Sequence, residues 1–110
     1  MPENFYVNTV GAVSSTKLSE AIELGKKLTA ESKAAGSERA SIGTIMTGNN
    51  AGSVVFQQFF NSLDDFANVM DAFATSSTYG KIMETGLKVT MRNVAKFCDV
   101  PFVAPENPTR

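Results

Sequence analysis

The hydrophobic and polar positions of this chain form one pattern that occurs twice. A strand-like run, a helix with an apolar stripe and a second strand-like run occupy roughly residues 4–47, and the same order returns over roughly 53–97. The strands carry apolar residues on both faces, yet only two main helices are available to cover them. The pattern therefore predicts a sheet with one face under its own helices and the other face in need of cover.

The first half predicts a strand over 4–13, a helix after it, and a strand over 39–47. Thr16 is the expected N-cap of the helix, and Gly36 is the expected C-terminal stop. Gly25 costs helix propensity in the middle of the apolar stripe, which indicates a close approach of the helix to the sheet. The stripe itself consists of Leu18, Ala21, Ile22, Gly25, Leu28 and Ser32.

The second half begins with a turn over 48–52, rich in Gly and Asn, which joins two strand-like runs and so predicts a hairpin. A strand over 53–60 follows, and Ser62 with Asp65 has capping-box spacing for the next helix. The apolar phase breaks near 76–80, which predicts a kink and a short extra helix ended by Gly86, before a strand over 87–97. The stripe of the longer helix consists of Leu63, Phe66, Ala67, Met70, Phe73, Ala74 and Ser77.

The order βαββαβ predicts a ferredoxin-like α+β domain, because right-handed crossovers place both helices on one face of an antiparallel sheet. The expected strand order is 4-1-3-2. The domain is expected to span 1–98, and a Pro-rich, irregular tail is expected over 99–110.

Alternation along the strands divides their residues between two faces, neither of which is a solvent face. The face expected to meet the helices holds Phe5, Val7, Thr9, Val54, Phe56, Gln58, Phe60, Val89 and Met91. The second face holds Tyr6, Asn8, Val10, Val55, Gln57, Phe59, Thr90, Arg92 and Val94. The economical way to cover this second face is a homodimer with the two sheets packed face to face as an α/β barrel. A register slip of one residue would exchange Gln57 and Gln58.

Composition removes several classes of function. The 110 residues carry a net charge of −1 without a basic patch, which argues against nucleic-acid binding. The chain has no His and a single Cys, Cys98, which excludes a Ser-His-Asp triad, an imidazole ligand and a Cys-rich zinc site. No cofactor or metal ion is expected, no segment is apolar enough to span a membrane, and the N-terminus lacks the pattern of a signal peptide. A cytoplasmic location is therefore expected.

The run SLDDFANVMDAFATSSTYGKIMETG, together with the hairpin and the element order, resembles the dimeric α/β-barrel superfamily. That group includes antibiotic-biosynthesis-monooxygenase-like, NIPSNAP-like, EthD-like and stress-responsive barrel domains. The resemblance covers 4–97 and implies a cleft between sheet and helices that holds a small, frequently aromatic ligand. Some members are oxygenases without a cofactor, some are isomerases, and the haem branches use a His ligand, which this chain lacks.

The preferred hypothesis for function is a dimeric barrel that binds a small apolar or aromatic molecule in a cleft between the sheet and the helices. An alternative is a monooxygenase-like or isomerase-like enzyme, in which Arg92 would supply positive charge to a developing oxyanion or enolate. A third possibility is a structural or interaction domain. Candidate ligand-binding residues are Tyr6, Asn8, Gln57, Tyr79 and Arg92, and the competing interpretation is that these polar groups are buried in a dimer seam. No catalytic residue is assigned.

Overall fold

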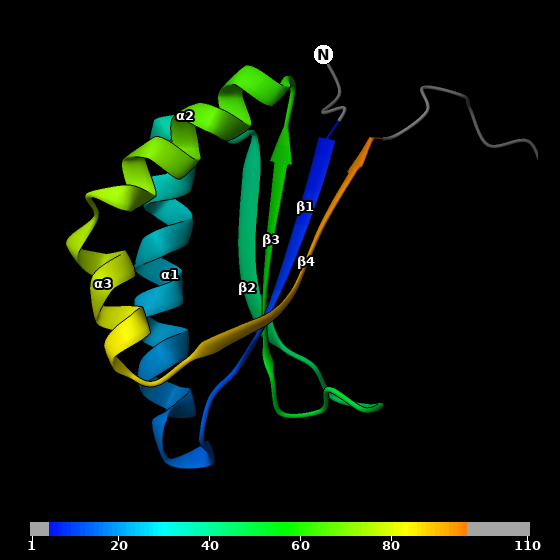
Figure 1. Ribbon diagram of the computed structural model, residues 1–110, viewed down its shortest axis with the longest axis vertical. Helices are drawn as coiled ribbons and strands as arrows, with labels where there is room; N and C mark the ends of the chain where they lie inside the picture. The colour runs from blue at the N-terminus through cyan, green and yellow to red at the C-terminus, as the bar shows by residue number, and fades with distance from the viewer. Residues whose placement is uncertain (1–4, 97–110) are drawn as a thin grey trace, which may run out of the picture.

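The computed structural model describes residues 5–96 and confirms the predicted order of elements (Figure 1). The elements are β1 (Phe5–Ala12), a 3-10 turn η1 (Ser15–Lys17), α1 (Leu18–Ala35), β2 (Arg39–Thr44), β3 (Val54–Phe60), α2 (Leu63–Ala74), α3 (Ser77–Glu84) and β4 (Lys88–Lys96). Phe97, Cys98 and the predicted tail over 99–110 lie outside the described residues.

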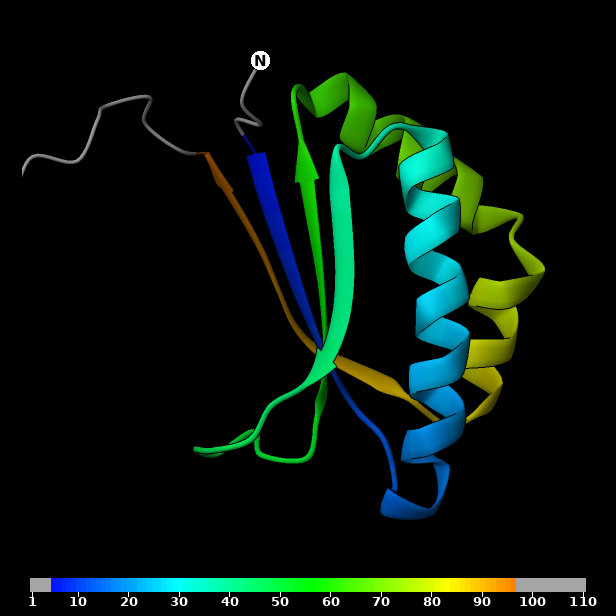
Figure 2. The same ribbon diagram turned by 180° about the vertical axis from the view of Figure 1, so that it is seen from behind.

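The four strands form one antiparallel sheet in the order β2-β3-β1-β4, which is the predicted order taken from the opposite edge. Figures 1 and 2 show α1, α2 and α3 together on one side of this sheet. The fold is thus a ferredoxin-like α+β arrangement, with the helices of both halves in one layer. Across the described residues, no helix is long and apolar enough to cross a membrane.

Local chemistry sets most of the helix ends. Ser62 Oγ accepts a hydrogen bond from the backbone N–H of Asp65 at 3.1 Å, which confirms it as the N-cap of α2. Gly36 follows α1 with φ of 142°, and its N–H reaches the carbonyl oxygens of Ser32 and Lys33. Thr16 is not an N-cap, because it lies within η1 and its hydroxyl pairs with Ser14 Oγ at 2.8 Å. The 3-10 turn delays the start of α1 to Leu18.

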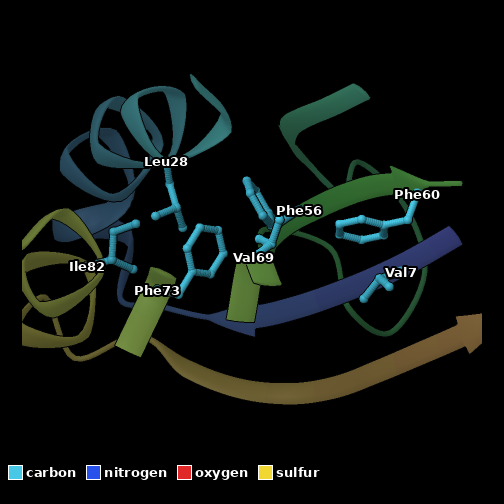
Figure 3. Packing of buried hydrophobic residues seen from close by; sticks show 7 residues of the cluster. All are labelled: Val7, Leu28, Phe56, Phe60, Val69, Phe73 and Ile82. Carbon is cyan, nitrogen blue, oxygen red and sulfur yellow. The ribbon is translucent and has the colours of Figure 1, made fainter. Parts of the chain in front are cut away.

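The core lies between the helices and the sheet face toward them, and Figure 3 shows seven of its side chains converging from both layers. Alternate residues of β3 are buried, from Val54 to Phe60, as a strand with one covered face requires. The fully buried Phe60 packs edge-on against Phe66 of α2, with ring centroids 5.5 Å apart. The central cluster is Val7, Leu28, Phe56, Phe60, Val69, Phe73 and Ile82.

A β-bulge in β4 changes which of its residues lie on each face of the sheet, so part of the predicted division is wrong. Val10 pairs with Met91, but the next residue, Gly11, pairs with Val89, so Thr90 is an extra residue. Residues directly opposite in an antiparallel pair share a face. Val89 therefore lies on the helix side as predicted, whereas three other assignments are wrong. Met91 lies on the open face, and Arg92 and Val94 lie on the helix side, opposite Thr9 and Val7.

Candidate ligand-binding cleft

A cleft of about 60 Å³ lies between the helix-covered face of the sheet and the three helices. Most of the residues that line it are apolar, including Phe56 and Phe73 from the core. The polar residues of the lining are Thr9, Gln58, Tyr79 and Arg92. The cleft is small beside typical small-molecule sites of roughly 300–1,000 Å³, so a ligand larger than a single ring requires side chains to move.

Arg92 brings a positive charge to this otherwise apolar lining. Its Nε donates a hydrogen bond to Thr9 Oγ1 at 3.1 Å across the β1–β4 pair, which fixes the direction of the guanidinium plane. The exposed Val89 and Met83 line the cleft with it, so Arg92 stands where the cleft opens to solvent. Because the guanidinium has five N–H donors, four remain for water or for an oxygen of a ligand.

Gln58 is the buried polar group of the cleft, with only 2% of its surface exposed. Its Nε2 donates to Ser32 Oγ of α1 at 3.0 Å, and Ser32 Oγ in turn pairs with Ser37 Oγ at 2.5 Å. This chain of hydrogen bonds joins the middle of β3 to the C-terminal end of α1. It satisfies polar groups that would otherwise be costly to bury, and it holds the Gln58 amide in one orientation.

Tyr79 closes the cleft from α3. Its ring stacks on Phe73, with centroids 5.7 Å apart and an interplanar angle of 20°. Ser76 caps α3 by accepting from the Tyr79 N–H at 3.1 Å, and its hydroxyl donates to Glu31 Oε1 of α1 at 2.5 Å. The kink between α2 and α3, which the break in phase predicted, thus positions Tyr79 over the core.

Two glycines let backbone and side chains approach closely beside the cleft. A Cβ built on Gly25 would lie 2.6 Å from Ile42 Cδ1, and one built on Gly11 would lie 2.6 Å from Leu87 Cδ2. Real Cβ atoms do not occur at such distances, so only glycine fits with these neighbours in place. The prediction that Gly25 allows α1 to approach the sheet is confirmed. Gly11, Ile42 and Leu87 all line the cleft.

The structure separates the five predicted site residues into two groups. Tyr79 and Arg92 line the same cleft. Tyr6, Asn8 and Gln57 lie on the other face of the sheet, where Gln57 Nε2 donates to Tyr6 Oη at 2.8 Å. Their alternation with the core residues of β1 and β3 makes this separation unavoidable.

Thr9 and Gln58 line the cleft but are absent from the predicted site residues, although alternation along β1 and β3 places both on the helix side. The available signal was a glutamine between two core phenylalanines of β3, Phe56 and Phe60, because a buried amide needs partners. Chemically, the lining offers one amide, two hydroxyl groups and one guanidinium. Residues 5–96 contain no group of three or more His, Cys, Asp or Glu side chains arranged to hold a metal ion. The cleft can therefore bind an apolar body, hydrogen-bond it and neutralise a negative charge.

The sheet order and the single helical layer define a ferredoxin-like α+β domain, and comparison with known proteins agrees. The chain belongs to the family described as the domain of unknown function DUF6854, whose model matches residues 3–97. No curated protein matches the chain.

Solved structures confirm the resemblance to the superfamily at the level of the fold. A dimeric ferredoxin-like protein from an uncultured marine organism is 16% identical, with a TM-score of 0.63 over 88% of this chain and 96% of that chain. An uncharacterised NIPSNAP domain protein from Burkholderia xenovorans is 11% identical, with a TM-score of 0.61 over 92% and 99%. An antibiotic biosynthesis monooxygenase is 9% identical, with a TM-score of 0.58 over 88% and 99%.

Proposed function

We propose that this protein is a homodimer that binds a small amphipathic molecule in the cleft, with an apolar ring in the core and an anionic oxygen at Arg92. The observation that carries the proposal is the placement of one guanidinium, oriented by Thr9, at the opening of an apolar cleft. A lone cation there favours a carboxylate or phenolate over a neutral ligand, because a charge-assisted hydrogen bond is about twice as strong as a neutral one.

The size of the cleft limits the ligand and indicates how it enters. About 60 Å³ of space suits part of a ring system, and the remainder must come from flexible lining residues. Met70 and Met83 line the cleft, and unbranched thioether side chains adapt to irregular shapes more easily than branched ones. Met83 of α3 is 40% exposed and Val89 of β4 is 38% exposed, and both line the cleft, so the ligand is proposed to enter beside these two residues.

The homodimer is supported by the uncovered face of the sheet. Half-buried Tyr6, Val55 and Phe59 lie there together with Met91, which is 37% exposed. Apolar surface of this kind usually marks an interface. The solved ferredoxin-like relative described as dimeric has the same fold. We place the folded unit of each subunit at residues 1–98.

Two naphthalene probes of similar size test the ligand class, namely anionic 1-naphthoate and neutral 1-naphthalenemethanol. We expect 1-naphthoate to bind more tightly and to shift the backbone amide resonances of Phe73, Tyr79 and Ile82 in NMR spectra. Arg92→Gln should weaken 1-naphthoate roughly tenfold and leave the neutral probe within about twofold, since only the charged contact is lost. Equal losses for both probes, or shifts confined to Tyr6 and Gln57, would contradict the proposal.

Lys88→Gln is the matched control for charge. Lys88 also lies on β4 and is exposed, but it does not line the cleft. Removal of the Lys88 charge should leave the affinity of both probes unchanged.

Light scattering on the same samples tests the homodimer, for which the expected mass is twice the 11.8 kDa of the chain. A mass of one chain would contradict it.

A further inference from the structure

A row of polar side chains crosses the open face of the sheet from one edge to the other. Ser41 of β2 pairs with Gln57 of β3, Gln57 pairs with Asn8 of β1, and Asn8 pairs with Asn93 of β4. Each strand thus contributes one polar residue at the same level. We name this set, Ser41, Gln57, Asn8 and Asn93, the polar row.

The polar row lies between two rows of different character on the same face. On one side, Phe59, Tyr6 and Ala95 follow across β3, β1 and β4, and on the other side Val55, Val10 and Met91 do so. Val10 is only 1% exposed within the single chain, so the accessible surface of the second row comes from Val55 and Met91. Tyr6 and Phe59 have ring centroids 5.0 Å apart. Figures 1 and 2 show no helix of the described residues on this side of the sheet. The face is therefore a polar stripe between an aromatic band and an aliphatic one.

Hydrogen bonding within a single chain leaves the polar row incomplete. Asn8 Oδ1 is buried and has no hydrogen-bond partner among the described residues. Asn93 Nδ2 donates to Met91 Sδ at 3.7 Å, and a thioether sulfur is a weak acceptor. The Asn8 side chain lies on the open face between Gln57 and Asn93, so a facing molecule is the available source of a further partner. Such groups are normally satisfied in the functional state of a protein.

Complementarity identifies the partner. Among the described strand residues, two charged side chains lie on this face, and neither belongs to the polar row. The guanidinium of Arg39 lies over the Phe59 ring at 4.2 Å from the centroid, and Lys88 pairs with Ala12 at the far end of the β1–β4 pair. An amide carries both donors and an acceptor, so a row of amides complements a copy of itself related by a two-fold axis. The apolar bands beside it are self-complementary in the same way. A charged partner would find no counter-charges in the polar row.

We propose that the polar row meets the polar row of a second copy of this chain and sets the register of the two sheets. This inference rests on the homodimer proposed above and assigns the residues that specify it. The apolar bands supply the burial, whereas the polar row penalises any offset, because a slipped arrangement would place amides against Val55 or Phe59 and leave them unsatisfied. Single buried polar residues fix register in this way between packed helices.

Asn8→Asp tests the proposal by placing two carboxylates in the seam of the dimer. We expect the dissociation constant, measured by light scattering over a dilution series at pH 7.5, to rise by roughly 100-fold or more, because unpaired buried charges are strongly unfavourable. Acidification to about pH 4.5 should lower the dissociation constant of this variant again by at least tenfold. Burial raises the pKa of the introduced carboxyl group, and the protonated carboxyl group can both donate and accept a hydrogen bond, as the amide does. Misfolding would not be reversed by acid in this way.

Two further variants make the experiment decisive. Asn68→Asp makes the same change on the exposed surface of α2 and should leave the dissociation constant within about threefold of wild type at both pH values. Gln57→Glu changes the polar row while its carboxylate can still accept a hydrogen bond from Tyr6 Oη. Gln57→Glu should raise the dissociation constant of the dimer as Asn8→Asp does. Far-ultraviolet circular dichroism should show that the subunit is still folded.

The outcomes separate this inference from the proposed function. A wild-type protein that is dimeric, with Asn8→Asp and Gln57→Glu equally dimeric, overturns the role of the polar row and leaves the homodimer standing. A wild-type protein that is monomeric at tens of micromolar overturns both. Binding of 1-naphthoate in the cleft is measured independently of either result.

Discussion

Arg92 lies directly opposite Thr9 across the β1–β4 pair, and its Nε donates to Thr9 Oγ1 at 3.1 Å. Both side chains point to the helix side of the sheet because the bulge at Thr90 reverses the alternation of β4 before Arg92 is reached. One extra residue therefore decides whether the guanidinium belongs to the cleft or to the open face. The cleft has a charged group because β4 is irregular.

Thr9→Val tests whether Thr9 orients Arg92. The substitution keeps the shape of the side chain and removes the acceptor, so the guanidinium gains freedom that ligand binding must restrict again. We expect the affinity for 1-naphthoate to fall about threefold, and the free energy of unfolding to fall by about 1 kcal/mol or less. Isothermal titration calorimetry and urea denaturation measure the two effects. Thr9→Ser keeps the hydroxyl and should restore the affinity, and its failure to do so would argue against the orienting role.

The bulge also shows what sequence reasoning could not supply. The strand over 87–97 was predicted nearly at its true position, and the strand order was correct. Strict alternation nevertheless assigned Met91, Arg92 and Val94 to the wrong faces, because no residue in LKVTMRNVAKF marks Thr90 as extra. The bulge is visible only in the pairing of β4 with β1, two segments far apart in the chain, where Val10 pairs with Met91 and Gly11 with Val89.

Gly25 should resist substitution although it lies within a helix. An alanine there gains about 1 kcal/mol of helix propensity, but its Cβ would lie 2.6 Å from Ile42 Cδ1. Overpacking of this kind costs about 1–3 kcal/mol, so we expect Gly25→Ala to lower the free energy of unfolding by about 1 kcal/mol. Ile42→Ala removes both of the atoms that would clash, Cδ1 at 2.6 Å and Cγ1 at 2.9 Å. In urea denaturation, the double variant should be about 1 kcal/mol more stable than the sum of the two single effects predicts. If the two effects simply add, the steric explanation is wrong.

Gly80→Ala is the matched comparison for Gly25→Ala. Gly80 lies within α3, is exposed, and has no atom within 4 Å of an added Cβ. Helix propensity then acts without a steric term, and we expect the free energy of unfolding to rise by about 0.5–1 kcal/mol. A fall in that free energy would show that α3 uses the flexibility of glycine at this position.

Ser32 should be more important to stability than its small size suggests. It is fully buried and links Gln58 Nε2 to Ser37 Oγ. Ser32→Ala leaves two buried polar groups short of a partner, and we expect the free energy of unfolding to fall by about 1–3 kcal/mol. Ser19→Ala, at an exposed position near the start of α1, should change it by no more than about 0.5 kcal/mol. Equal effects of the two substitutions in urea denaturation would show that the buried link contributes little.

The link between Ser32 and Gln58 illustrates which parts of the site the sequence reveals. Helical spacing placed Ser32 in the buried stripe of α1, and alternation placed Gln58 on the helix side. Neither pattern indicates that the two side chains meet, because they are 26 residues apart and the contact depends on where α1 crosses the sheet. Faces can be predicted from periodicity, whereas pairs of polar groups depend on the packed structure.

Ser62 and Ser76 perform the same local task, and a comparison of the two isolates what Ser76 adds. Each accepts a hydrogen bond at 3.1 Å from the N–H three residues later, and each begins a helix. Ser76 also donates to Glu31 Oε1 and so ties α3 to α1. Ser62→Ala should lower the free energy of unfolding by about 1 kcal/mol, the usual effect of losing a cap. Ser76→Ala should lower it by about 2 kcal/mol, because a hydrogen bond to a carboxylate is lost as well.

Ser76→Asp distinguishes the two roles of Ser76. Aspartate caps helices as well as serine does, but its carboxylate would face Glu31 instead of donating to it. We therefore expect Ser76→Asp to lower the free energy of unfolding by about 1 kcal/mol at pH 7. This loss should disappear when Ser76→Asp is combined with Glu31→Gln, because the repulsion between the two carboxylates is then removed. Tyr79 lies three residues into α3 and lines the cleft, so the affinity for 1-naphthoate should follow the same order as stability. If stability changes while the affinity for 1-naphthoate stays constant across these variants, α3 does not position the cleft.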